Sequence, residues 1–154
     1  MPCESGVAVD ILAEVPMRIV APAGWSRHVR DASLEDLAHL PWVYTSESCP
    51  FHAMNRELFS DLDTEPDKVA YVDSEDAVRE LIRAGAGLSI LRADDAARME
   101  ASGDGVSWTG DTPGIELGFA VRQQRAGEPL VSTMQSLIAA MWLDSPEFAA
   151  GAEA

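Results

Sequence analysis

The alternation of apolar and polar residues is most regular in the middle of the chain. Val69–Val72 is a short apolar run with an aromatic residue, which is typical of a buried strand. Asp73–Ala84 places apolar residues at helical spacing and is followed by Gly85, a residue type that favours the left-handed end of a helix. Leu88–Leu91 is a second apolar run. A strand, a helix and a strand joined by short turns predict a βαβ unit with parallel strands.

The rest of the chain continues this alternation of strands and helices. Further strands are predicted at Val7–Leu12, Val15–Ala21, Trp42–Thr45 and Ile115–Gln123. Further helices are predicted at Ser33–Leu40, from Pro50 to about Leu62, at Arg92–Glu100 and at Leu130–Trp142. The expected fold is therefore α/β: a mainly parallel five-stranded sheet with helices on both faces, built from the strands near Arg18, Val43, Ala70, Ser89 and Leu117.

Composition narrows the classes of function. The chain has 154 residues, of which 47% are hydrophobic and 24% charged, as in an ordinary globular protein. It contains no apolar run of roughly 20 residues and no basic, signal-like start, so we expect a cytoplasmic protein without a membrane partner. A formal net charge of −15 disfavours binding of nucleic acid. The two cysteines match no disulfide framework or zinc pattern, and no cofactor motif is present, so no cofactor or metal is expected.

Polar residues follow two of the predicted strands, at the point where a helix begins. Ligands of open parallel sheets bind beyond the carboxyl ends of the strands, where helix N-termini offer free N–H groups to a carboxylate or another small anion. Phe51 could add an apolar wall for an aromatic ligand. The alternative is that the hydroxyl groups only cap the helices. The predicted ligand-binding residues are Thr45, Ser46, Ser48, Cys49, Phe51, Asp73 and Ser74.

A catalytic role has weaker support. Cys49 precedes a predicted helix, where a thiol can be activated, and His52 follows three residues later. No residue that would orient such a base is evident, and the chain carries no recognisable catalytic motif. We therefore predict that the chain is not an enzyme.

Four stretches resemble a known family when they are taken in order: Leu37–Thr45, Cys49–Phe51, Val72–Ser74 and Arg83–Leu91. They are similar to the effector-binding domain of LysR-type transcriptional regulators, over roughly residues 15–143. The resemblance implies a periplasmic-binding-protein-like (type II) fold, in which two lobes close on a small metabolite that often carries a carboxylate. In this lobe, Thr45, Ser46 and Ser74 would supply hydrogen bonds to the effector.

The resemblance also has two gaps. The winged helix-turn-helix of the family and the start of its first lobe have no counterpart, so this chain is not expected to bind DNA itself. The implied organisation is an N-terminal extension (1–14), an effector-binding lobe (15–126), a C-terminal helix (127–145) and a disordered tail (146–154). Without the usual partner lobe, the apolar face of that helix would pack elsewhere or mediate self-association.

Two functions from different classes remain open at this point. The main hypothesis is a ligand-sensing regulatory domain that controls transcription in response to a small-molecule effector. The alternative is a solute-binding module of the periplasmic-binding-protein type without catalytic activity; the absence of a signal-like start disfavours it.

Overall fold

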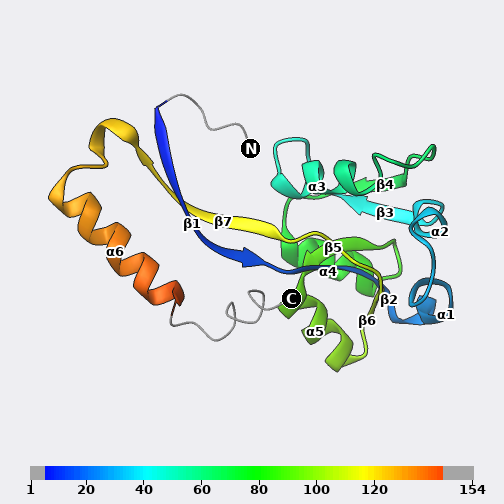
Figure 1. The fold of residues 1–154 in the computed structure, drawn as a ribbon. Coiled ribbons are helices and arrows are strands. Elements are labelled where there is room, and N and C mark those ends of the chain that lie inside the picture. The colour runs from blue at the N-terminus through cyan, green and yellow to red at the C-terminus, as the bar shows by residue number, and fades with distance from the viewer. Residues whose placement is uncertain (1–5, 144–154) are drawn as a thin grey trace. The chain divides into compact units, whose positions relative to one another are not determined.

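The structure is a computed structural model that describes residues 6–143, and it divides the chain into two compact units (Figure 1). One unit is continuous, Pro16–Pro113, and the other combines the chain up to Val15 with the chain from Gly114. The strands are β1 Val7–Val15, β2 Met17–Pro22, β3 Pro41–Tyr44, β4 Asp67–Tyr71, β5 Ser89–Arg92, β6 Gly105–Ser107 and β7 Ile115–Arg122. The α-helices are α1 Ser26–Val29, α2 Leu34–Ala38, α3 Pro50–Leu58, α4 Glu75–Arg83, α5 Ala93–Ser102 and α6 Pro129–Leu143, and short 3₁₀ turns lie at Ala23–Trp25 and Gln123–Arg125.

The strands of the continuous unit form mixed sheets, so the prediction of a mainly parallel five-stranded sheet is wrong in detail. β3 and β4 pair in parallel, while β2 pairs antiparallel with both β5 and β6. A parallel bridge between Trp42 and Leu88 links the β3 side to β5. β2 follows β1 directly, so no helical crossover fixes it parallel to its neighbours.

The predicted βαβ stretch forms β4, α4 and β5, with boundaries shifted by one or two residues. Ser74 caps α4 by accepting a hydrogen bond from the Ala77 N–H, and Gly85 follows the helix with φ = +84°. Gly87 then lies so close to β3 that an added Cβ atom would stand 2.6 Å from the Pro41 carbonyl oxygen. Only a residue without a side chain fits at this junction.

Apolar side chains cover both faces of these strands. On one face, α4 and α5 pack on the sheet in a core made of Val20, Val43, Val78, Ile82, Leu91, Ala96 and Met99. On the other face, the Trp42 indole N–H donates to the Leu37 carbonyl of α2 at 2.8 Å, and its ring contacts Phe59 at 5.0 Å between centroids. Helices on both faces are therefore confirmed for this unit.

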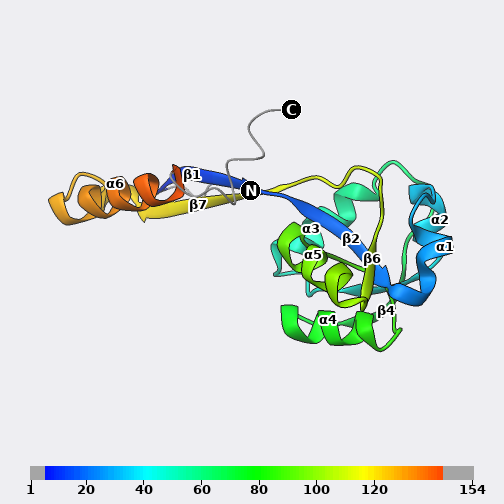
Figure 2. The ribbon, with the colours of Figure 1, turned by 90° about the horizontal axis from the view of Figure 1, so that it is seen from below.

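The second unit is a two-stranded ribbon with one helix. β7 pairs antiparallel with β1 and not with the strands of the other unit, which corrects the prediction that the strand near Leu117 belongs to the main sheet. Burial alternates along β7 as its sequence pattern predicts. α6 lies beside the ribbon (Figures 1 and 2), and Gln135 of α6 donates to the Asp10 carboxylate of β1 at 2.7 Å. The predicted tail, 146–154, lies outside the described residues.

Among residues 6–143, no helix is both long enough and apolar enough to cross a membrane.

Candidate functional site

The two polar stretches predicted as a ligand site come together in the structure. The Ser46 backbone N–H, just beyond β3, donates to Asp73 Oδ1 just beyond β4, at 2.7 Å. The Ser46 and Ser48 hydroxyls lie 2.9 Å apart, and the Cys49 N–H closes the turn by donating to the Ser46 carbonyl. Parallel pairing of β3 with β4 explains this meeting, because it places the carboxyl ends of both strands at one edge.

Asp73 sets the electrostatics of this turn. The backbone N–H and side chain of Ser46 lower the pKa of the Asp73 carboxyl below its ordinary value of 3.8, so the group is a carboxylate at neutral pH. A carboxylate only accepts hydrogen bonds. The edge therefore offers a fixed acceptor as well as hydroxyl donors, and a ligand with hydroxyl groups fits this mixture better than a bare anion does.

Thr45 is the most unusual of the predicted residues. The residue is 7% exposed, and its hydroxyl oxygen is buried with no hydrogen-bond partner among the described residues. Burying a hydroxyl without a partner is unfavourable, so an ordered water or a ligand would stabilise this group. Asn55 Oδ1, on α3, is buried in the same unpartnered way.

The remaining predicted residues have local structural roles as well. Ser74 is the cap of α4, although the distance from its oxygen to the Ala77 nitrogen is 3.4 Å, which leaves a weak bond. Cys49 stands at the start of α3, half-buried, with a free thiol and no capping bond from its side chain. Phe51 is half-buried in the first turn of α3. The structure thus brings Ser46 and Asp73 together, with Thr45 next to Ser46 in the chain, and a role in ligand binding stays a prediction for all seven residues.

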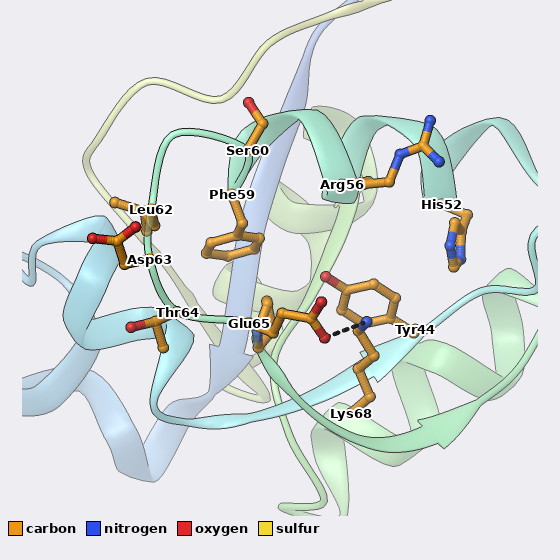
Figure 3. Close-up of a pocket in the computed structure, with 11 residues that line it drawn as sticks. Tyr44, His52, Arg56, Phe59, Ser60, Leu62, Asp63, Thr64, Glu65 and Lys68 are labelled. Atoms are coloured by element: carbon orange, nitrogen blue, oxygen red, sulfur yellow. Dashed lines mark ion pairs between the residues drawn. The ribbon is translucent and has the colours of Figure 1, made fainter.

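Sequence reasoning missed two residues next to this turn, Tyr44 and His52. His52 Nδ1 lies 3.0 Å from the Thr45 carbonyl oxygen, and the imidazole contacts the Tyr44 ring edge-on. Both side chains line a cavity of about 340 Å³ beside α3 (Figure 3). The sequence suggests His52 only as a possible base beside Cys49 and Tyr44 only as part of a strand. The one available signal was that Tyr44 ends the strand just before the predicted turn.

Metal binding finds no support among residues 6–143, because no three His, Cys, Asp or Glu side chains there are placed to share an ion.

Comparisons with known proteins identify the fold. The sequence matches the LysR substrate binding domain family over residues 2–142, and no curated protein matches it. The effector binding domain of QuiR, solved with shikimate, has a TM-score of 0.77 at 14% identity, and the match covers 93% of this chain and 68% of that one. The regulatory domain of CcmR from Synechocystis PCC6803, solved with 2-PG, also has a TM-score of 0.77, at 13% identity, and the match covers 94% of this chain and 71% of that domain. Full-length CbnR, solved with its target DNA, has a TM-score of 0.68 at 19% identity, and the match covers 92% of this chain and 48% of CbnR.

Because the family match spans nearly the whole chain, this protein belongs to the LysR substrate-binding domain family. The fold is the α/β fold of LysR effector domains. The chain spans about two thirds of the separate effector domains and about half of the full-length regulator.

Proposed function

We propose that this chain is a ligand-sensing regulatory domain of a LysR-type transcriptional regulator, that it works in the cytoplasm, and that it binds without catalysing a reaction. The effector would be a small polar metabolite, with hydroxyl groups in addition to any carboxylate. The QuiR and CcmR domains were solved with shikimate and 2-PG respectively, which supports a small-molecule ligand for this fold. The lack of a basic cluster supports the further expectation that this chain does not itself contact DNA.

The observation that carries the proposal is the buried, unpartnered hydroxyl of Thr45 beside the bond from Ser46 to Asp73. A ligand hydroxyl could accept from Thr45 and donate to the Asp73 carboxylate, which would satisfy both groups. The N-terminus of α3 adds a local attraction for a ligand carboxylate, and the distant charges of this acidic chain are screened beyond about 10 Å.

Calorimetric titration with a panel of small hydroxy-carboxylates, shikimate included, tests this site. The double variant Thr45→Val with Ser46→Ala removes both hydroxyls and nearly preserves the buried volume. We expect it to bind the best ligand of the panel at least tenfold more weakly than the parent, since a lost hydrogen bond to a charged group is worth about 1.5–3 kcal/mol.

The matched control is Ser132→Ala with Thr133→Ala, which removes the same two kinds of hydroxyl from exposed positions on α6. It should bind as the parent does. Equal affinity of the Thr45/Ser46 variant and the parent, or no binding by any member of the panel, would contradict the proposed site.

We also propose that α6 mediates self-association, with a second copy of the chain as the partner. Leu130, Met134 and Leu137 recur at helical spacing and are 70, 48 and 60% exposed. Apolar residues aligned in this way on one helix face are typical of contact surfaces. Sedimentation should show a dimer that Leu137→Gln weakens and that Ser136→Gln, at the neighbouring exposed position, leaves intact; a parent that is monomeric at all concentrations would refute this part.

A further inference from the structure

The cavity beside α3 is a second candidate binding site, separate in its lining from the residues of the proposed effector site. It lies within the continuous unit, between α3 and the segment that leads into β4 (Figure 3). Its volume of about 340 Å³ lies within the range of small-molecule pockets, roughly 300–1,000 Å³. Its lining consists of Tyr44, His52, Arg56, Phe59, Ser60, Leu62, Asp63, Thr64, Glu65, Pro66 and Lys68.

The Tyr44 hydroxyl is the polar group that marks this cavity as a site. Tyr44 is 2% exposed, yet no described residue hydrogen-bonds to its hydroxyl. In Figure 3 the hydroxyl end of the ring points toward the space between Phe59 and Arg56. Burial, followed by the charges of Tyr71 and Glu65, raises the pKa of Tyr44 to about 12, so the phenol keeps its proton and can donate. Because Tyr44 lines the cavity and no described residue accepts from its phenol, the hydroxyl can donate to a ligand held there.

The charges around Tyr44 select the ligand. Lys68 already lies over the Tyr44 ring, 5.2 Å from its centroid, and pairs with Glu65 at 3.6 Å. A cationic ligand would therefore meet an ammonium group at the same ring. Arg56 is exposed and has no ion-pair partner among residues 6–143, so its guanidinium is available to an anion. Of the two acidic groups on the lining, Glu65 is already paired with Lys68, and Asp63 is exposed to solvent.

We propose that this cavity binds a small aromatic or apolar monocarboxylate. The Tyr44 phenol and the Arg56 guanidinium would donate to the carboxylate, and the apolar body would pack against Phe59, Leu62 and Pro66. This site is additional to the effector site at Thr45, Ser46 and Asp73, and its ligand carries an apolar body in place of the hydroxyl groups that the effector site favours.

The test uses three probes of the same shape: phenylacetate, phenylacetamide and phenethylamine, each titrated into the full chain. Phenylacetate should bind most tightly and phenethylamine least. Tyr44→Phe should lower the affinity for phenylacetate about tenfold, because one hydrogen bond to a charged group is lost. Arg56→Gln should lower the affinity for phenylacetate and leave the affinity for phenylacetamide unchanged. The control Arg27→Gln removes an exposed cation from α1, outside the cavity, and should change neither affinity.

Three results would overturn the inference: no saturable binding of phenylacetate, phenethylamine binding as tightly as phenylacetate, or unchanged affinity in Tyr44→Phe. The Thr45→Val/Ser46→Ala variant separates the two sites. If this double variant no longer binds the hydroxy-carboxylate but still binds phenylacetate, both sites stand. If the double variant loses phenylacetate binding and Tyr44→Phe retains it, phenylacetate occupies the effector site and this second site is refuted.

Discussion

The two units contain similar apolar residues but bury them to different extents. In the unit Pro16–Pro113, Trp42, Ile82 and Leu88 have no exposed surface. In the unit of β1, β7 and α6, Ile11 and Leu130 are 56% and 70% exposed. The first unit has layers on both faces of its strands, whereas a two-stranded ribbon with one helix cannot enclose its own side chains. Stability should therefore reside in the first unit, whereas the second leaves apolar side chains exposed.

The largest test of this comparison places the same charge in each unit. Ile82→Asp introduces a carboxylate into the core between α4 and the sheet and should lower the free energy of unfolding by roughly 4 kcal/mol or more, out of a typical total of about 5–15. Leu137→Asp, at a position 60% exposed, should change it by less than about 0.5 kcal/mol. Denaturant titration monitored by circular dichroism measures both, and similar losses in the two variants would break the comparison.

A smaller effect is expected at the junction of β3 with β5. Gly87→Ala would press a Cβ atom against the Pro41 backbone and should cost about 1–3 kcal/mol. Gly24→Ala is the control, because no atom lies within 4 Å of the Cβ atom that it would add. If both variants unfold at the same denaturant concentration as the parent, the close approach of Gly87 to β3 is incorrect.

Ser89 and Tyr44, on neighbouring strands, differ in whether the hydroxyl has a partner inside the chain. The Ser89 hydroxyl donates to the Val43 carbonyl at 2.7 Å, so Ser89→Ala should lower stability by about 1–2 kcal/mol. The Tyr44 hydroxyl has no such partner, so Tyr44→Phe should leave stability unchanged or raise it by up to about 1 kcal/mol. Thermal unfolding of both variants without ligand checks this; a marked loss in Tyr44→Phe would mean that the phenol has a partner inside the chain.

The smallest effect concerns pH. Because the Asp73 pKa is lowered on folding, its bond to Ser46 stabilises the fold above the ordinary value of 3.8, and this contribution is lost as the pH falls through the lowered value. Carbon-13 titration of the Asp73 carboxyl should give a midpoint below 3.8. A midpoint at or above that value would show that the Ser46 bond does not hold in solution.

The sequence was sufficient for local structure and for which stretches meet. Helical spacing and capping residues predicted α4 between Ser74 and Gly85, and the meeting of the Thr45 turn with Asp73 follows from parallel strands. The pairing of β7 with β1 could not be predicted, because alternation along a strand shows which face is buried and not which strand is its neighbour. The unpartnered hydroxyls of Thr45 and Tyr44 could not be predicted either, since they depend on what long-range packing leaves without a partner.

An amide chemical-shift titration of the full chain with the tightest hydroxy-carboxylate of the panel would locate the effector site residue by residue. We expect the responding amides to cluster at Thr45, Ser46 and Ser74, and the responses to vanish in the Thr45→Val/Ser46→Ala variant. Responses that cluster elsewhere, or that persist unchanged in this variant, would contradict an effector site at the edge where β3 and β4 end.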